Sequence, residues 1–310
     1  AQALRAEGFA VALEQIFAAA GKRGVSIGFE ASVAGGIPIL KAIREGLVGN
    51  RILEVYGIIN GTANFILSGM TDRGDDFQSV LKEAQAAGYA ERDPALDIQG
   101  IDEAQKLAIL ISLCYGVVPP QKGIFVEGIE KVTSLDIDFA KKLGYVIKLL
   151  AIAREAGGSP PTVEARVHPT MIPLHHPLAD VGGVFNAIFL KGDAVGETMF
   201  FGRGAGMMPT ASAVVSDIVM AAQRIGSVGT ILPVPLLRPA RLLPIEELSS
   251  EYYLRFTVVD RPGVLARIAT HLGREEISIS SVYQQERDVG ARVPIVVMTH
   301  QAREKNIRKA

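Results

Sequence analysis

Hydrophobic positions follow two different periods over the first two thirds of the chain. Apolar residues recur at helical spacing in seven segments, which are predicted helices: 4–20, 38–47, 63–69, 76–87, 101–115, 137–152 and 209–225. Extended segments between them are predicted strands: 25–30, 51–60, 162–172, 184–193 and 197–204. Gly21 and Gly24 are expected to end the first helix, and Pro209 suits the first turn of the last. This order predicts an α/β fold with a mixed sheet.

The pattern changes near residue 226. Residues 226–249 hold four prolines and have no clear period, which is typical of a linker between domains. Beyond the linker, residues 252–310 read as strand, helix, strand, strand and the start of a helix. This order predicts an incomplete ferredoxin-like unit (βαββα) that lacks one closing strand.

Composition narrows the class of protein. Apolar residues make up 48% of the 310 residues and charged residues 21%, which favours a globular protein. The 32 basic and 33 acidic residues nearly balance, and tryptophan is absent, so neither a nucleic acid nor a membrane is an expected partner. The longest apolar run, around residues 107–118, is too short to span a bilayer. A single cysteine, Cys114, is expected to be buried and inert, which fits a cytoplasmic protein.

The segment GYAERDPALDIQGIDEAQKLAILISL, residues 88–113, carries the strongest chemical signal. Asp102 and Lys106 are four residues apart and share one helix face, at the mouth of a very apolar helix. Such spacing commonly marks a solvated ion pair. The preceding carboxylates of Glu91, Asp93 and Asp97 would repel one another unless a cation or an ammonium group sat among them. The segment therefore also suits binding of an amino acid, with Lys106 as proton donor.

Two glycine-containing turns have weaker signals. FEASVAGGIP, residues 29–38, could hold a cation with the Glu30 carboxylate and exposed carbonyls, but residue types alone favour a plain strand-to-helix turn whose glycines allow tight packing. FGRGAGMMPTASAVVSD, residues 201–217, leads into a helix whose free N–H groups could face a cofactor, but an ordinary helix start is the simpler interpretation.

Two further groups of residues are unlikely sites. His168, His175 and His176 match no standard zinc spacing and lack a cysteine partner. Thr62, in NGTANF, has no companion base for nucleophilic catalysis.

Five segments taken together resemble the homoserine dehydrogenase family. They are EASVAGGIP, GIINGTANFIL, EAQAAGYAERDPALDIQGIDEAQKL, HHPLADVGGVFNAI and GRGAGMMPTASAVVSDI, in the family's order, and the likeness covers residues 4–225. Residues 252–310 resemble an ACT domain, whose strand-to-helix turn has the form DRPGVL, here Asp260 to Leu265.

The resemblance implies an NAD- or NADP-dependent oxidoreductase that interconverts L-homoserine and L-aspartate 4-semialdehyde on the route to threonine and methionine. It implies that Lys106 is the catalytic proton donor and that Asp102 works beside it. Glu91 would bind the amino end of the substrate, with Asp97 nearby. Thr62 would lie next to both the substrate and the nicotinamide.

Further site residues follow from the same resemblance. Gly88 and Gly206 would lie near the cofactor, together with Thr62. A sodium ion would be held by the Glu30 carboxylate and the backbone carbonyls of three residues, which are Val33, Gly35 and Ile37.

The resemblance also divides the chain into domains. Residues 1–30 would be the remnant of a dinucleotide-binding domain whose G-x-G-x-x-G turn is missing, and residues 31–225 the catalytic and dimerisation domain. The helix 209–225 is expected to pack back on the nucleotide domain. Residues 226–249 would be the linker and 250–310 the ACT regulatory domain, which stops inside its second helix. We expect the chain to be a fragment that binds the cofactor poorly by itself.

Partners are expected to be the small-molecule substrate, an allosteric threonine at the ACT domain, and further copies of the chain in a homodimer or homotetramer. Two non-catalytic hypotheses remain open at this point. The chain could sense an amino acid through its ACT unit, or it could assemble with a complete enzyme.

Overall fold

The computed structural model describes residues 15–16, 19–25, 27–120, 123–158, 162–223, 238–239, 241–284 and 291–310. The chain divides into two compact units between Leu242 and Leu243. Among the described residues, no helix is both long and apolar enough to cross a membrane. The predicted helix 4–20 lies largely outside the described residues; its described end continues through residue 23, past Gly21, before the turn at Gly24.

A mixed sheet forms the centre of the first unit, as predicted. Its order is β3-β5-β4-β1-β6-β7, with β9 also pairing with β5. Only β3 and β9 run parallel to β5, and the other pairs are antiparallel. The strands are β1 (Ile52–Ile58), β3 (Phe125–Val126), β4 (Tyr145–Gly157), β5 (Thr162–Pro173), β6 (Phe185–Gly192), β7 (Gly196–Arg203) and β9 (Arg241–Leu242). A short pair, β2 (Val117–Val118) and β8 (Arg238–Pro239), lies apart from this sheet.

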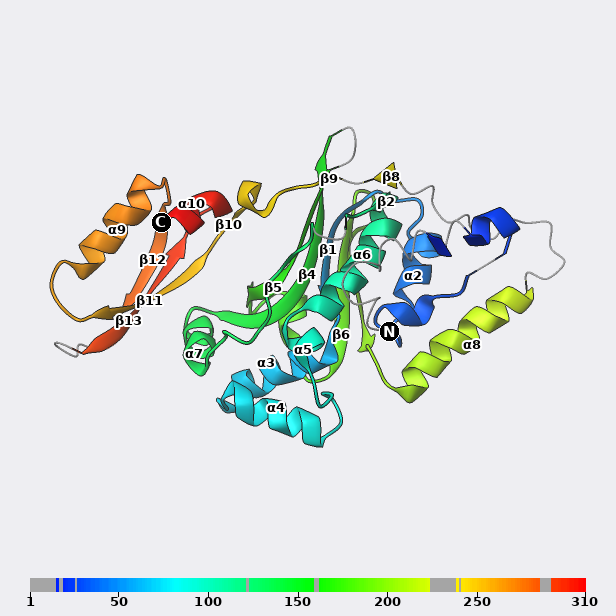
Figure 1. The fold of residues 1–310 in the computed structure, drawn as a ribbon, viewed down its shortest axis with the longest axis horizontal. Helices are drawn as coiled ribbons and strands as arrows, with labels where there is room; N and C mark the ends of the chain where they lie inside the picture. Colours follow the sequence, from blue (N-terminus) through cyan, green and yellow to red (C-terminus); the bar gives the residue numbers. More distant parts are fainter. Residues whose placement is uncertain are drawn as a thin grey trace. The chain divides into compact units, whose positions relative to one another are not determined.

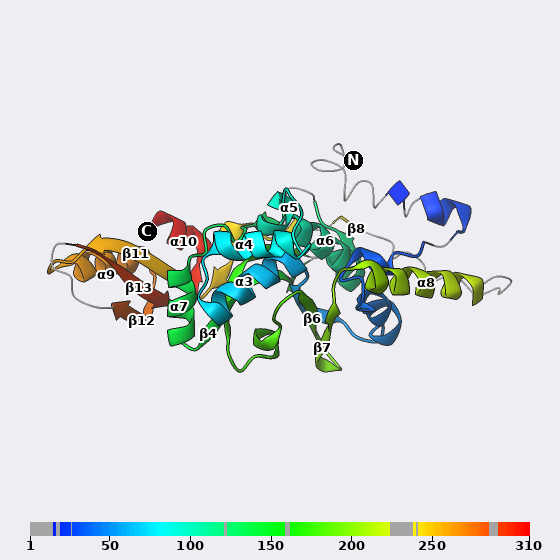
Figure 2. The same ribbon diagram turned by 90° about the horizontal axis from the view of Figure 1, so that it is seen from below.

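Helices cover the sheet around β4, where α3, α6 and α7 all contact it (Figure 1, Figure 2). The helical elements of this unit are η2 (Glu30–Ser32), α2 (Ile39–Lys41), η3 (Ala42–Gly46), α3 (Gly61–Arg73), α4 (Phe77–Ala86), α5 (Ala95–Ile98), α6 (Ile101–Tyr115), α7 (Ser134–Lys142), η4 (Pro177–Asp180) and α8 (Met207–Gln223). The main hydrophobic core lies between these helices and the sheet.

Helix α6 follows its predicted bounds because glycine stands at both ends. Gly100 and Gly116 adopt positive φ angles of 77° and 65°, a left-handed conformation that glycine adopts without steric cost. Leu107, Leu110 and Ile111 form its core-facing stripe and are fully buried. The first turn therefore remains at the edge of the core while the rest of the helix lies inside it.

Two predicted elements are wrong. The predicted helix 137–152 ends at Lys142, and a strand begins at Tyr145 after Gly144 turns with a φ of 83°. The strand β4 is buried on both faces, so its apolar run has no alternation and reads like a helix. The predicted strand 25–30 is absent from its described residues, because residues 27–29 form an irregular segment that enters η2.

The second unit has the predicted βαββα order. Its elements are η5 (Ile245–Glu247), β10 (Ser249–Ser250), β11 (Tyr253–Val259), α9 (Val264–Arg274), β12 (Ile279–Gln284), β13 (Arg292–Thr299), β14 (Ala302–Arg303) and α10 (Glu304–Lys309). Antiparallel strands β11-β13-β12 form one sheet, and β10 pairs with β14. Its own small core includes Leu272, Ile295 and Val297.

Candidate active site

The first turns of α6 carry an ion pair between Asp102 and Lys106. Lys106 Nζ lies 2.7 Å from Asp102 Oδ2 and 2.9 Å from the carbonyl oxygen of Ile59, to which it also donates. The Lys106 and Asp102 side chains are 21% and 29% exposed. Lys106 is therefore held by two acceptors, yet it remains open to a small molecule.

Asn60 connects this pair to a second acidic residue, Asp97. It ends the segment that follows β1 and caps α3, and its side-chain amide donates to Asp97 Oδ1 at 2.7 Å and to Asp102 Oδ2 at 2.9 Å. Two of the predicted carboxylates, from α5 and from α6, are thus brought together by one neutral side chain. Sequence reasoning missed Asn60; its only signal was an asparagine directly before a helix.

Glu103 follows Asp102 but points into the core. It is 1% exposed, and neither of its carboxylate oxygens has a hydrogen-bond partner among the described residues. Burial raises the pKa of Glu103 well above its usual range, and the negative charge of Asp102 adds to this effect. The raised pKa favours the protonated, neutral form of this carboxyl group, which reduces the negative charge that Glu103 adds to the site.

The loop after α4 holds two more of the predicted residues, Gly88 and Glu91, and lies against Thr62 of α3. Gly88 has a φ of 74° at the end of that helix. The Thr62 hydroxyl donates to the Tyr89 carbonyl at 2.7 Å, which fastens the loop to α3. Glu91 is exposed, and no hydrogen bond or ion pair within the described part of the chain joins its side chain to Asp97, Asp102 or Lys106. The structure thus groups Asp97, Asp102 and Lys106 and leaves Glu91 separate.

The turn proposed for a cation is built around Glu30. Its side chain is buried, and its two carboxylate oxygens accept the N–H groups of Leu40 at 2.9 Å and Lys41 at 3.0 Å. Burial raises the pKa of Glu30, while these two donors act in the opposite direction. Each oxygen keeps a further lone pair, so the carboxylate could bind a cation in addition to stabilising the start of α2. The predicted carbonyl ligands at Val33, Gly35 and Ile37 belong to the same turn.

Comparison with known proteins gives the family. The family model described as "Homoserine dehydrogenase" matches residues 38–219, more than half of the chain. The chain belongs to the homoserine dehydrogenase family. The homoserine dehydrogenases of Neisseria gonorrhoeae and Synechocystis sp. are 48% and 44% identical to it, over 96% of this chain and 69% and 70% of those proteins. An ACT domain model matches residues 252–310.

Solved structures agree with this assignment. A homoserine dehydrogenase from Thiobacillus denitrificans superimposes with a TM-score of 0.89 at 47% identity, over 97% of this chain and 69% of that one. A hyperthermophilic archaeal homoserine dehydrogenase mutant in complex with NADPH gives a TM-score of 0.60 at 29% identity, over 71% and 63% of the two chains. The family assignment makes the chain an oxidoreductase of amino-acid biosynthesis that uses NAD(P), and the non-catalytic hypotheses are not favoured.

Gly206 stands directly before the long helix α8. Gly206 has a φ of 119°, and its carbonyl accepts the N–H of Thr210 at 3.0 Å. In both views α8 extends away from the sheet (Figure 1, Figure 2). Most of its large apolar side chains are exposed: Met207, Met208, Val214, Val215, Ile218 and Val219. Asp217 ties α8 to the Glu30 turn, because it accepts the Glu30 N–H at 3.0 Å and pairs with Lys41 at 3.0 Å.

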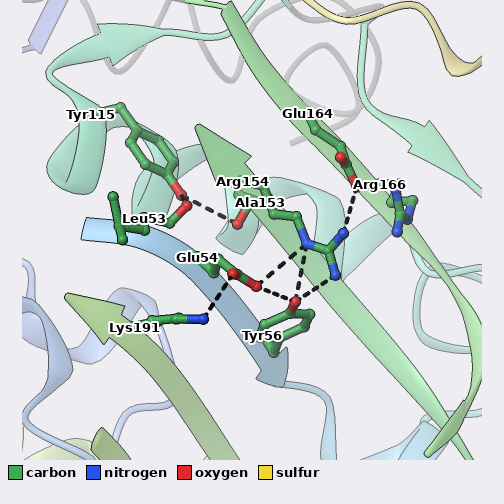
Figure 3. A network of polar contacts seen from close by, with 9 residues as sticks. All are labelled: Leu53, Glu54, Tyr56, Tyr115, Ala153, Arg154, Glu164, Arg166 and Lys191. Atoms are coloured by element: carbon green, nitrogen blue, oxygen red, sulfur yellow. Dashed lines mark hydrogen bonds and ion pairs between the residues drawn. The ribbon is translucent and has the colours of Figure 1, made fainter. Parts of the chain in front are cut away.

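A second polar cluster lies on the central strands of the mixed sheet (Figure 3). The Tyr56 hydroxyl donates to Glu54 and accepts from Arg154, and Glu54 also pairs with Lys191. Burial and the hydrogen bond to Glu54 raise the pKa of Tyr56 to about 12. Each of these charges already has a partner of opposite sign, so this cluster is a structural network rather than a second site.

His168 lies on strand β5, and His175 and His176 stand directly before η4. Among the described residues, no group of three or more histidine, cysteine, aspartate or glutamate side chains could hold a metal ion. His176 instead accepts the N–H of Leu178 at the start of η4.

Proposed function

We propose that Lys106 and Asp102 perform the proton transfer when this enzyme interconverts L-homoserine and L-aspartate 4-semialdehyde. The observation that carries the proposal is the 2.7 Å contact between Lys106 Nζ and Asp102 Oδ2 at the partly open end of a buried helix. NAD(P)H, when bound, supplies the hydride that reduces the aldehyde carbon. Lys106 Nζ donates a proton to the aldehyde oxygen as negative charge develops on it, and Asp102 keeps the ammonium group in position.

The carboxylates near Lys106 suit the amino end of the substrate. Asp97 and Asp102 each engage Asn60 through one oxygen, which leaves their other oxygens for a substrate ammonium group. Glu91 lies in the loop before them and is exposed, so we propose that it closes on the ammonium when substrate binds. Thr62 supports this arrangement through its bond to Tyr89.

For the cofactor, we propose a place near Gly88, Thr62 and Gly206. The exposed apolar side chains of α8 fit the expectation that this helix packs against a dinucleotide-binding domain. The NADPH found with the archaeal relative supports NADP as the cofactor. We further propose that sodium binds Glu30 with the carbonyls of Val33, Gly35 and Ile37, a set of hard oxygen ligands around one buried carboxylate.

For regulation, we propose that threonine binds the ACT unit near the Asp260–Leu265 turn, where two copies of the chain meet in a dimer or tetramer. Gly263 turns with a φ of 88° and opens α9. Asp260 Oδ2 is buried and has no hydrogen-bond partner among the described residues, so it is available for an amino-acid ammonium group. Calorimetry with threonine tests this site, and an absence of heat with folded protein would contradict it.

Paired kinetics test the catalytic proposal. In the full-length protein, Lys106→Ala should abolish nearly all turnover of homoserine while the NADPH affinity, measured by fluorescence titration, changes little. An equal loss of NADPH affinity would place Lys106 in the cofactor site and contradict its role as proton donor.

A further inference from the structure

The side-chain amide of Asn60 joins three elements at the catalytic pair. Asn60 follows β1 and caps α3, and its Nδ2 reaches Asp97 on α5 and Asp102 on α6. The residue before it, Ile59, accepts the hydrogen bond from Lys106. Four groups therefore form a closed ring: the Ile59 carbonyl, the Lys106 ammonium, the Asp102 carboxylate and the Asn60 amide.

The orientation of this amide is fixed by its partners. Asn60 Oδ1 accepts the Ala63 N–H at 2.9 Å, which caps α3. A flipped amide would turn its oxygen toward two carboxylates and its NH₂ toward an N–H donor, and both contacts would be repulsive. Asn60 is also 6% exposed, so water cannot replace the amide readily. The capping bond thus directs both N–H bonds of the Asn60 amide at the carboxylates of Asp97 and Asp102.

An asparagine is suited to this place for a chemical reason. Asp97 and Asp102 carry like charges and each approach the same nitrogen within 3 Å. An amide NH₂ offers two diverging donors without adding charge, so it can hold two carboxylates side by side while leaving their free oxygens for a ligand. Lys106 alone cannot do this, because the ion pair it makes here reaches only Asp102.

We infer that Asn60 is a positioning residue that sets the two carboxylates for the substrate ammonium group and fixes Asp102 against Lys106. This inference rests on the function proposed for Lys106 and Asp102. It assigns to Asn60 a part in both substrate affinity and turnover, beyond the capping of α3.

The variant Asn60→Asp separates positioning from capping. Aspartate has the same shape and is an equally good cap, but it presents an oxygen where the NH₂ donor stood. Loss of charge-assisted hydrogen bonds should lower kcat/KM for homoserine by about 10- to 100-fold. Inhibition by 4-hydroxybutyrate, which lacks the ammonium group, should weaken less than twofold. A second variant, Asn60→Ala, adds no charge. It should likewise lower kcat/KM for homoserine much more than it weakens inhibition by 4-hydroxybutyrate.

Asn64 on the same helix provides the matched control. It is 2% exposed, and among the described residues its amide donates only to backbone carbonyls, those of Val181, Gly183 and Phe185. Asn64→Ala should lower the melting temperature but leave the homoserine KM within about twofold, since it removes no hydrogen bond to a carboxylate.

Three outcomes decide the matter in the full-length protein. A selective loss in both folded Asn60 variants supports the inference. Unchanged kcat/KM in Asn60→Asp, while Lys106→Ala collapses turnover, overturns the inference alone. Retained turnover in Lys106→Ala overturns the proposed function instead, because the pair would then be only a structural ion bridge.

Discussion

Two lysines of the first unit are withdrawn from water in different ways. Lys106, at the start of α6, is 21% exposed in its side chain and has a carboxylate partner at 2.7 Å. Lys148, in the middle of β4, is 3% exposed and donates to the Val181 carbonyl at 2.6 Å, with the Asn64 amide oxygen at 3.5 Å. Both therefore bind a backbone carbonyl, but within the part of the chain that the structure describes only Lys106 has an ion-pair partner, and its side chain is also partly exposed.

The difference in surroundings separates a chemical role from a structural one. Burial lowers the pKa of Lys148 to about 8, and the more distant charges of Asp72 and Asp180 offset this only in part. Lys148 has no access to a substrate, so its bonds serve to hold the Val181 segment on the sheet. Lys106 combines a counter-charge with access, which is what a proton donor needs.

The largest expected effect is on turnover at the α6 pair. Lys106→Ala should lower kcat by on the order of 100- to 1000-fold, because it removes the donor that meets the developing charge. The kcat of Asp102→Asn should be closer to that of Lys106→Ala than to that of the wild type. Lys148→Met provides the control, and its kcat should stay within about twofold. Steady-state kinetics of the full-length protein would contradict the comparison if both lysine variants lost turnover equally.

The next effect is a pH-dependent change in stability at Lys148. Between pH 8 and 10.5 the unfolded chain keeps the lysine proton while the folded chain releases it, so stability rises with pH over this window. The rise amounts to roughly 3 kcal/mol, because burial lowers the pKa of Lys148 from 10.5 to about 8. Lys148→Met should lack this rise in stability. The Val181 carbonyl still accepts a hydrogen bond from Asn64 in this variant, so it is not left without a donor.

Urea unfolding of both proteins from pH 7 to 10.5 measures this difference. We expect the variant to be the more stable protein at pH 7 and to lose that advantage as the pH rises. A stability difference that does not vary with pH would show that Lys148 remains charged in the folded protein.

A smaller stability gain is expected at Glu103, the buried neighbour of Asp102. Because its folded pKa is raised, the folded protein keeps this proton above pH 4.5 while the unfolded chain loses it, and stability falls as the pH rises. Glu103→Met should stabilise the protein at pH 7 by about 1–3 kcal/mol. Thermal unfolding at pH 7 and pH 4.5 checks this, and a gain of the same size at both values would point to packing alone.

The smallest effect concerns Glu91, which is exposed and lies outside the ring formed around Asn60. If it binds the substrate ammonium in ground and transition states alike, Glu91→Gln should raise the homoserine KM by roughly 10-fold with little change in kcat. The nearby exposed Asp93 gives a control in Asp93→Asn. A fall in kcat with an unchanged KM would assign Glu91 a role in the chemical step.

Sequence reasoning reached α6 and its charged pair because both depend on local spacing. Periodicity and two flanking glycines define the helix, and an i,i+4 spacing places Asp102 beside Lys106. Strand β4 was missed because burial on both faces removes the alternation that marks a strand. Asn60 was missed because its partners lie 37 and 42 residues further along the chain, a distance that no local pattern encodes.

Chemical rescue of Lys106→Ala tests the central claim most directly. A small primary amine can enter the space left by the missing side chain and donate the proton in its place. We expect the rate of aldehyde reduction by this variant in the full-length protein to rise with methylamine concentration and with the protonated fraction of the amine, while Lys148→Met shows no response. A rate that is independent of amine, in a variant that is folded and binds NADPH normally, would contradict the role of Lys106 as proton donor.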